Sequence, residues 1–387
     1  MSKPKIRFKG YTDEWEQRKL GDIADIVGGG TPSTSKEAYW DGEIDWYTPA
    51  EITNQIYLDS SERKITKEGF NNSSAKMLPI GTVVFTSRAG IGKMAILRKE
   101  SCTNQGFQSI VPHEKELDSY FIFSRSKELK RYAETVGAGS TFVEVSGKQM
   151  AAMELMMPPI IEEQRQIGEY FEKVDHLITL HQRKCEEMKK LKKYMLQKMF
   201  PQNGMKTPEI RFKGFTDDWE QRKAKELCNI GTGKSNTQDQ VEDGIYPFYI
   251  RSDIPVKSNK YLYDCEAVIT IGDGNIGRVF HYVNGKFDLH QRCYKMTDFQ
   301  DILGKYFYYF FSTRFYDRAM KMTAKATVDS VRLEMISEMD IFKPAQIEEQ
   351  KKIAEFFTNL DHLITLHQRK CDELQNIKKF MLQNMFV

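Results

Sequence analysis

The sequence predicts a mixed α/β (α+β) fold in which two mixed domains are separated by two long antiparallel helices that form a coiled coil. Three observations predict it: a length of 387 residues, an internal repeat, and a heptad pattern at the end of each half. At roughly 100 to 200 residues per domain, such a chain holds two or more folded units. With 40% hydrophobic and 12% aromatic residues, the composition supports packed cores and excludes disorder throughout.

The chain contains two blocks of sequence twice. Residues 4–19 (PKIRFKGYTDEWEQRK) recur as 208–223 with three differences, and residues 161–200 recur as 347–386 with 14 differences. The two offsets, 204 and 186, place about 18 extra residues in the first half, most simply between residues 20 and 90. We therefore predict a pseudo-two-fold repeat with a first domain at 1–159, a helix and linker at 160–203, a second domain at 204–345 and a second helix at 346–387.

Each half ends in a heptad seam that is typical of a coiled-coil helix. A helix of about 40 residues is about 60 Å long and cannot bury such a stripe alone, so we expect the two helices to pair antiparallel. The leading seam positions are Ile167, Phe171, Val174 and Ile178 in the first helix, and Ile353, Phe357, Leu360 and Ile364 in the second.

One stretch of the helices, DHLITLHQRKC at 175–185, recurs unchanged at 361–371. Its polar members also match, and a buried seam alone does not explain that identity. We therefore predict docking surfaces for two copies of one partner, with a seam that resists change as the alternative. The polar candidates are Gln182, Arg183, Gln368 and Arg369.

Within the domains, strand–turn–strand patterns at 81–97 and 267–282 and helical stretches at 118–132 and 301–321 indicate mixed α/β structure. The aromatic run 306–311 (YFYYFF) is interpreted as a buried helix rather than a base-stacking platform, because consecutive aromatic residues point all round a helix.

The sequence contains fragments of common catalytic and cofactor-binding motifs, but the residues around them do not fit such sites. Residues 272–277 fit Gly-x-Gly-x-x-Gly, but a strand pattern follows where a dinucleotide site needs a helix. The triplet 62–64 (ERK) has no counterpart in the second half, and no Walker loop occurs. We expect no catalytic centre and no metal site. The six cysteines read as reduced thiols, and with no signal-peptide or membrane-span pattern we expect a cytoplasmic protein.

Three motifs in a fixed order carry a family resemblance: RFKGYTDEWEQRKLGDI with its copy RFKGFTDDWEQRKAKEL, the turn SRAGIGK, and the Glu-Glu-Gln that begins each helix. Over essentially the whole chain the sequence resembles the specificity subunit (HsdS) of type I restriction-modification systems. The resemblance implies a non-catalytic DNA-binding subunit with two target recognition domains, each of which reads one half of a bipartite target in double-stranded DNA.

The same resemblance implies the assembly in which the chain works. The helices would set the spacing of the half-sites and dock two modification subunits, which methylate adenine with S-adenosylmethionine. Two restriction subunits would use ATP and Mg to translocate and cut DNA. The chain would bind no cofactor itself, yet both methylation and restriction would require it. The net charge of only +3 suits a DNA reader that holds DNA within a larger assembly.

Base readout in the major groove needs Arg, Lys, Asn, Gln, Ser or Thr on a pre-positioned surface. Loops after the strand-like segments 44–47 and 246–250, the glycine turns, and two later polar turns offer such side chains. The DNA-binding candidates are Thr48, Asn54, Gln55, Arg88, Lys93, Ser140 and Thr141 in the first domain, and Arg251, Ser252, Lys257, Arg278, Lys325 and Thr327 in the second.

An alternative from another class is a non-enzymatic coiled-coil scaffold with two protein- or ligand-binding domains. DNA binding that weakens with salt would separate the two hypotheses, because a scaffold of this kind has no affinity for DNA.

Overall fold

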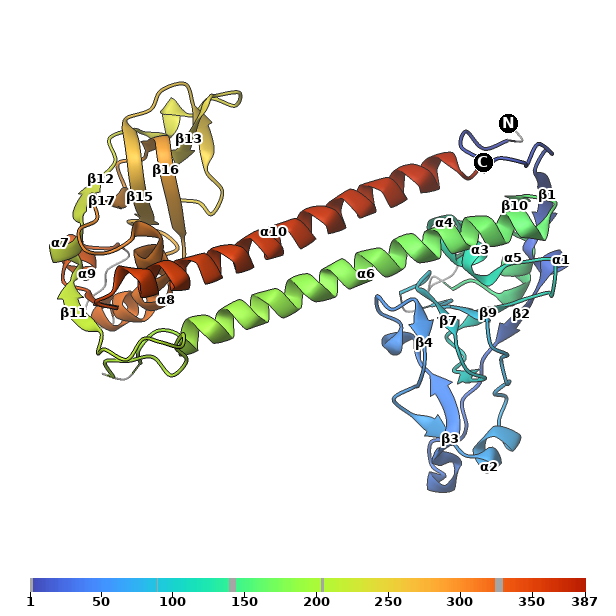
Figure 1. Ribbon diagram of the computed structural model, residues 1–387. Helices are drawn as coiled ribbons and strands as arrows, with labels where there is room; N and C mark the ends of the chain where they lie inside the picture. Colours follow the sequence, from blue (N-terminus) through green and yellow to red (C-terminus); the bar gives the residue numbers. More distant parts are fainter. Residues whose placement is uncertain (1–2, 89, 139–143, 203–204, 324–329) are drawn as a thin grey trace. The chain divides into compact units, whose positions relative to one another are not determined.

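The chain divides into two compact units, each of which contains one mixed domain and a part of both long helices (Figure 1). The computed structural model describes residues 3–88, 90–138, 144–202, 205–323 and 330–387. Unit 1 comprises residues 1–181 and 370–387, and unit 2 comprises residues 182–369.

The two long helices are α6 (Ile161–Lys198) and α10 (Ile347–Asn384), of 38 residues each. Both begin with two glutamates in the first turn, where the helix dipole favours negative charge. At 1.5 Å per residue each helix is about 57 Å long.

The helices pair antiparallel within each unit, as the seam predicts. In unit 1, Asp175 of α6 binds Lys378 of α10 at 2.6 Å, and Phe171 stacks on Phe386. In unit 2, Lys192 of α6 binds Asp361 of α10 at 2.5 Å, and Phe200 stacks on Phe357. The pairs are equivalent, because Lys192 and Asp175 of the first repeat correspond to Lys378 and Asp361 of the second.

The apolar seam itself is buried. Ile167, Phe171, Val174 and Ile178 of α6 are buried, as are Ile353, Phe357 and Leu360 of α10, whereas Ile364 is half-buried.

The repeated segment that precedes each domain ties the two helices together at their ends. In unit 1 the Ile6 N–H donates to the carbonyl of Asn384 at the end of α10, at 2.9 Å. The next residue, Arg7, forms a bidentate ion pair with Glu163 in the first turn of α6, at 2.7 and 2.8 Å. A bidentate pair fixes direction as well as distance, so this segment joins the start of α6 to the end of α10.

Unit 2 repeats the arrangement with the helices exchanged. The Ile210 N–H donates to the Lys198 carbonyl at the end of α6, at 3.0 Å. Arg211 pairs with Glu349 in the first turn of α10 at 2.6 and 2.8 Å. The Arg-Phe-Lys-Gly motif and the first turn of each helix are therefore partners in one contact, which gives a physical reason for their joint repetition.

The glutamine of each Glu-Glu-Gln motif binds the loop that leads into the domain's own helix. Gln164 accepts from the Asp118 N–H at 3.2 Å and donates to the Glu116 carbonyl at 3.0 Å. Gln350 accepts from the Leu303 N–H at 3.0 Å. In each domain, a glutamine side chain of a long helix thus holds the backbone of the domain's loop.

Unit 1 contains two sheets beside a short ladder of β1 (Glu16–Lys19) with β10 (Glu154–Met157). The larger sheet has the order β2 (Ala24–Gly28), β9 (Gln108–Pro112), β6 (Val83–Phe85), β7 (Met94–Leu97), β4 (Tyr57–Leu58). The smaller has β5 (Lys64–Ile65), β3 (Trp40–Tyr47), β8 (Cys102–Thr103).

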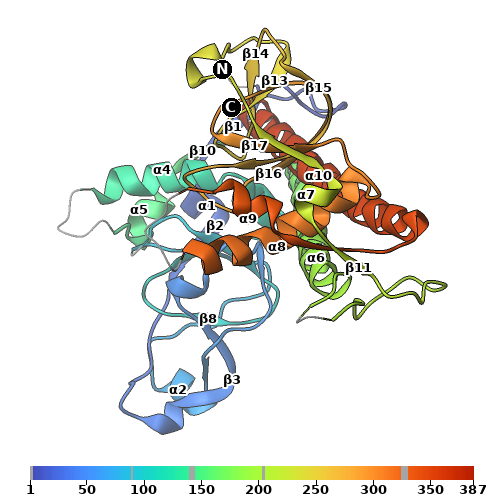
Figure 2. The same cartoon turned by 90° about the vertical axis from the view of Figure 1, so that its left-hand side faces the viewer.

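The described helices of unit 1 outside α6 and α10 are short. They are α1 (Leu20–Ile23), η1 (Glu37–Tyr39), η2 (Pro49–Glu51), α2 (Lys67–Asn71), α3 (Ser119–Ser124), α4 (Ser126–Gly137) and α5 (Gly147–Ala151). Helix α3 is capped by Asp118, whose carboxylate accepts from the Phe121 N–H at 2.8 Å, and it packs on β6 and β7. Helices α4 and α5 lie against each other (Figure 2).

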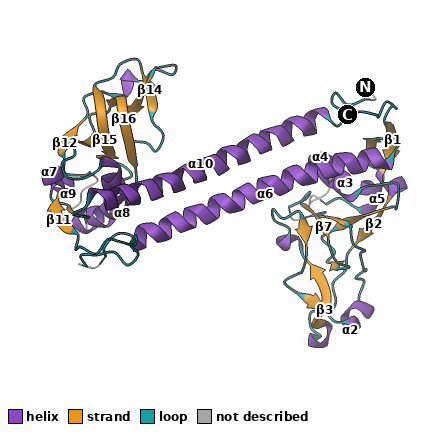
Figure 3. Ribbon diagram, viewed as in Figure 1, coloured by secondary structure: helices purple, strands orange, loops and turns teal. Residues whose placement is uncertain are grey.

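Unit 2 has a six-stranded sheet and a short ladder of β11 (Glu220–Lys223) with β18 (Asp340–Lys343). Figure 3 shows strands of the sheet in orange, with β12, β14, β15 and β16 labelled. The sheet has the order β12 (Asn229–Thr232), β17 (Cys293–Thr297), β15 (Tyr263–Ile271), β16 (Phe280–Leu289), β13 (Tyr246–Tyr249), β14 (Val256–Ser258). The remaining described helices are α7 (Ala224–Leu227), η3 (Thr237–Asp239), α8 (Gly304–Thr323) and α9 (Leu333–Ser337).

Helix α8 carries the aromatic run and packs on β15 and β16. Tyr306, Phe307, Tyr309, Phe310 and Phe311 are all buried, and Tyr309 donates to the Asp361 carboxylate at 2.8 Å. The run is a core helix, as predicted.

The longer first half has its additional structure between β3 and β6. Strands β4 and β5 and helix α2 lie there, within the span where the offsets of the repeat placed the extra residues. The corresponding stretch of unit 2, between β13 and β15, contains β14 as its described strand.

Candidate nucleic-acid interface

Three loops of unit 2 meet beside β13, and we call them loop cluster 2. They follow β13, join β15 to β16, and join β16 to β17. Strand β13 runs parallel to β16, and the His290 N–H donates to the Tyr249 carbonyl at 3.0 Å. The Gly272 N–H donates to the Arg292 carbonyl at 2.7 Å. Backbone bonds therefore hold the three loops in one place.

Unit 1 builds the same frame, which we call loop cluster 1. Strand β3 runs parallel to β8, and the Asn104 N–H donates to the Tyr47 carbonyl at 3.0 Å. The Ser87 N–H donates to the Gly106 carbonyl at 2.8 Å. By these bonds, Asn104 corresponds to His290 and Gly106 to Arg292.

The side chains on the shared frame differ in charge. In loop cluster 2, Asp273 accepts from Nη1 of Arg251 at 3.1 and 3.2 Å and from Nη1 of Arg292 at 2.8 Å. Loop cluster 1 has a glycine where Arg292 stands. Its Gln105 bonds Thr31, and its Arg88 lies 4.0 Å from Glu144. One frame thus presents two chemically different surfaces.

The electrostatics of loop cluster 2 keep its carboxylate ionised and its imidazole neutral. Burial raises the pKa of Asp273, but hydrogen bonds from Arg292 and Arg251 outweigh burial and the net pKa is lowered. Burial and the nearby Arg251 lower the pKa of His290. Its Nδ1 accepts from the Arg292 N–H at 3.1 Å. Together, Asp273 and the two arginines that bond it carry a net charge of one positive unit.

The close approach of two loops in this cluster requires a glycine. A Cβ on Gly272 would lie 2.5 Å from the Arg292 carbonyl oxygen, closer than non-bonded atoms approach. Any side chain at residue 272 would push Arg292 away.

The structure places the predicted first-domain candidates unevenly. Thr48 caps η2, and both its N–H and its hydroxyl donate to Glu51. These polar atoms are therefore engaged in hydrogen bonds within their own loop. Gln55 likewise bonds the carbonyl of Glu51. Asn54 and Lys93 are exposed and Arg88 is half-buried, so these three side chains remain accessible.

The second-domain candidates fall into two groups. Arg251 belongs to loop cluster 2, and Ser252 next to it bonds the Ile254 carbonyl at 2.5 Å. Arg278 lies over the ring of Tyr316 and donates to its hydroxyl at 2.8 Å. Lys257 is exposed on β14. The remaining candidates, Ser140, Thr141, Lys325 and Thr327, lie outside the described residues.

The helix positions predicted for docking are exposed: Gln182, Arg183, Gln368 and Arg369. Sequence reasoning gave less weight to the large apolar side chains that remain exposed at equivalent positions of both helices. These pairs are Leu177 with Leu363, Leu191 with Ile377, and Tyr194 with Phe380. Their heptad spacing, outside the seam, was the signal that could have identified them.

Sequence reasoning also missed Asp273 and Arg292. Asp273 stands in the glycine turn that was rejected as a dinucleotide site, and Arg292 lies in a segment with no motif. Only the backbone pairing of the two loops brings them to Arg251.

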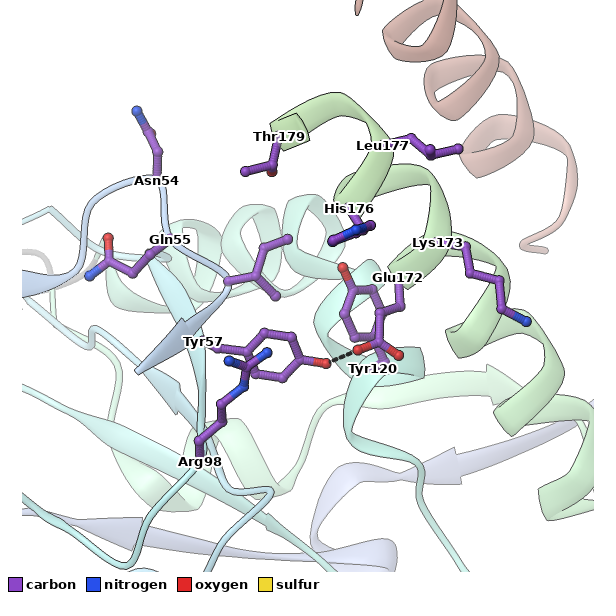
Figure 4. Close-up of a pocket in the computed structure, with 11 residues that line it drawn as sticks. Asn54, Gln55, Tyr57, Arg98, Tyr120, Glu172, Lys173, His176, Leu177 and Thr179 are labelled. Atoms are coloured by element: carbon purple, nitrogen blue, oxygen red, sulfur yellow. Dashed lines mark hydrogen bonds between the residues drawn. The ribbon is translucent and has the colours of Figure 1, made fainter. Parts of the chain in front are cut away.

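A pocket of about 720 Å³ in unit 1 lies between α6 and the loops around β4 (Figure 4). The Tyr57 hydroxyl donates to Glu172 of α6, and the Arg98 guanidinium lies 4.1 Å from the Tyr57 ring centre. Burial and this carboxylate raise the pKa of Tyr57. Asn54 and Gln55 also line the pocket. The Tyr57–Glu172 bond joins β4 to α6, so it fastens the domain to the helix.

Across the described ranges, no group of three or more His, Cys, Asp or Glu side chains is placed to hold a metal ion. The six cysteines are free thiols. In the same part of the chain no helix has the length and apolarity that a membrane crossing needs.

The chain is an internally duplicated protein. Each half consists of a mixed domain with the same loop frame, followed by a long helix. The profile of the family described as type I restriction modification DNA specificity domain matches residues 12–190 and 216–376. The chain belongs to this family, and the resemblance to specificity subunits is confirmed.

Curated relatives of this chain are also specificity subunits of type I restriction enzymes. The chain is 30% identical over 246 residues to the type I restriction enzyme MjaIX specificity subunit of Methanocaldococcus jannaschii, which covers 61% of this chain and 57% of the relative. It is 32% identical over 180 residues to the EcoR124I/EcoR124II specificity subunit of Escherichia coli, covering 44% and 43%. The matched part thus spans about half the length of these relatives.

A crystal structure of the type I restriction-modification system S subunit from M. genitalium has a TM-score of 0.74 to this chain. The match is 14% identical and covers 100% of this chain and 99% of that one. At this identity the likeness shows the fold, and it confirms the predicted fold class.

Proposed function

We propose that the chain is the DNA-reading, non-catalytic subunit of a type I restriction-modification complex in the cytoplasm. Each loop cluster reads one half of a bipartite target in double-stranded DNA, and the helices α6 and α10 set the spacing of the two halves. Methylation and restriction both depend on this reading. Family membership supports the general role.

The observation that carries the proposal is the pair of loop clusters. The same backbone bonds hold three loops in each domain, from Asn104 to Tyr47 in one and from His290 to Tyr249 in the other. The side chains on that frame differ, because Arg292 stands in one cluster where the other has Gly106, and Asp273 stands where the other has Arg88. A constant frame with variable polar side chains is what reading two different base sequences requires.

The helices support a second part of the proposal, the docking of two modification subunits. Leu191 and Tyr194 of α6 and their equivalents Ile377 and Phe380 of α10 are between 39% and 56% exposed. Exposed apolar residues at regular spacing are typical of partner surfaces. Their repetition offers the same surface twice, which fits two copies of one partner. S-adenosylmethionine then belongs to the modification subunits, and ATP and Mg to two restriction subunits.

Co-expression with the cognate modification subunit, followed by genome-wide mapping of N6-methyladenine, tests the proposal. We expect methylation within one split motif whose half-site centres lie about 10 bp apart. Replacing residues 20–157 with the equivalent region of a related subunit should change one half of the motif only.

The control for that replacement is an exchange of residues 224–343, which should change the other half. Methylation without a split motif, or a replacement that alters both halves, would contradict the proposal. Complete absence of DNA affinity in the assembled complex would favour a protein-binding scaffold instead.

A further inference from the structure

We propose that Arg292 reads a guanine in the half-site of unit 2, with Asp273 and Arg251 as positioning residues that hold its guanidinium in place. This inference rests on the proposed function and names a base that the second domain recognises. It follows from the geometry of loop cluster 2.

The guanidinium of Arg292 is anchored on one side and open on the other. Its Nη1 donates to Oδ2 of Asp273 at 2.8 Å, and its side chain is 61% exposed. Within the described residues, its Nε and Nη2 make no hydrogen bond to the protein. That free edge carries two parallel N–H donors, which match the O6 and N7 acceptors of guanine in the major groove. Adenine offers only one acceptor there beside a donor.

The aspartate argues for base reading over a phosphate contact. A phosphate contact needs positive charge, and an ionised carboxylate between two arginines reduces the positive potential of the loop cluster. Asp273 instead gives direction, because a guanidinium held by one nitrogen loses most of its rotational freedom before DNA arrives. Arg251 lies on the other side of Asp273 at 3.1 Å and completes the neutralisation of the carboxylate.

The backbone beneath Arg292 is fixed as well. Its carbonyl accepts from the Gly272 N–H at 2.7 Å, and the Gly272 carbonyl accepts from the Val331 N–H at 2.6 Å. Its own N–H donates to His290. Arg292 thus stands on backbone that is bonded on both sides.

Loop cluster 1 has Gly106 at the equivalent of Arg292, so this contact belongs to one domain only. Its consequence is an asymmetric target. Substitutions in loop cluster 2 should change one half of the motif and leave the half read by unit 1 as an internal control.

The experiment is N6-methyladenine mapping of the co-expressed complex with Arg292→Ala. Alanine removes both donors, so we expect the preference for one guanine in one half-site to fall about 5- to 150-fold, with the other half unchanged. Arg292→Lys keeps the charge but not the planar pair of donors and should lose a smaller part of that preference. Arg222→Lys, in the same domain but on β11 and bonded to Glu226, is the matched control and should keep the motif.

The other outcomes overturn the inference in distinguishable ways. If Arg292→Ala weakens methylation equally at all sites and leaves the motif unchanged, Arg292 contacts phosphate. If Arg251→Ala removes the preference for guanine and Arg292→Ala does not, the assignment to Arg292 is wrong. A wild-type split motif without guanine in the half-site of unit 2 also overturns it. Absence of any split motif would instead refute the proposed function.

Discussion

The ion pair between Arg7 and Glu163 allows a direct test of what joins each domain to its helices. The Glu163 side chain is fully buried and that of Arg7 is 12% exposed. Glu163→Gln removes the negative charge but keeps the shape, and leaves Arg7 with its bond to the Asp13 carbonyl at 2.5 Å. We expect this substitution to destabilise unit 1.

The magnitude follows from the two bonds that are lost. Hydrogen bonds between charged groups contribute about 1.5–3 kcal/mol each, and a neutral amide restores about 1 kcal/mol. Breaking a buried pair by removing one partner costs about 3–5 kcal/mol. Since Arg7 keeps a carbonyl partner and some contact with solvent, we expect about 3 kcal/mol for Glu163→Gln. The equivalent substitution Glu349→Gln in unit 2 should cost at least as much, because Arg211 forms the same bidentate pair with Glu349.

Urea denaturation followed by tryptophan fluorescence measures the effect. In a Trp219→Phe background the remaining tryptophans, Trp15, Trp40 and Trp46, all lie in unit 1. Glu169→Gln is the matched control, because its partner Lys173 and Glu169 itself are exposed on the same helix, and we expect at most about 0.5 kcal/mol.

A double-mutant cycle of Glu163→Gln with Arg7→Met isolates the interaction energy between these two side chains from their other contributions to stability. A coupling energy below about 1 kcal/mol, or a loss no larger than that of Glu169→Gln, would refute the reasoning.

Two further predictions concern unit 2 and the helices. Burial lowers the pKa of His281 and His290 below the ordinary 6.5. As the pH falls, the unfolded chain therefore takes up protons on these histidines before the folded chain does. The free energy of unfolding of unit 2 should be highest above pH 6.5 and should decrease below it. Urea midpoints across that range check this, and His281→Gln should flatten the decline. Tyr194→Ser and Phe380→Ser should each reduce capture of the modification subunit by the purified chain about equally, whereas Lys190→Ala should not; unchanged capture by both serine variants would contradict docking on these faces.

Much of the fold could be predicted from periodicity and repetition. Seven of the eight leading heptad positions of α6 and α10 are buried and the eighth, Ile364, is half-buried, and the aromatic run of α8 lies in the core. Both features depend on residues close together in sequence, where helix geometry alone decides which side chains share a face. The strand–turn–strand patterns succeeded for the same reason.

The partners of the repeated motifs could not be predicted in that way. Arg7 and Glu163 are 156 residues apart, and both are ordinary charged residues in a sequence rich in them. Nothing local distinguishes Glu163 from Glu162, yet one is buried and the other exposed. Their pairing follows from where the first segment crosses the start of α6.

For the candidate site, too, local sequence patterns could be predicted and long-range contacts could not. The sequence by itself determined that two unlike domains stand on two like helices, because repeats and their differences are visible in one chain. Only the tertiary structure decided that Arg251, Asp273 and Arg292 form one cluster, and that Thr48 caps its own loop instead. Parallel pairing of β13 with β16 and the bond from Gly272 to Arg292 bring distant loops together, and such long-range backbone contacts leave no periodic pattern in the sequence.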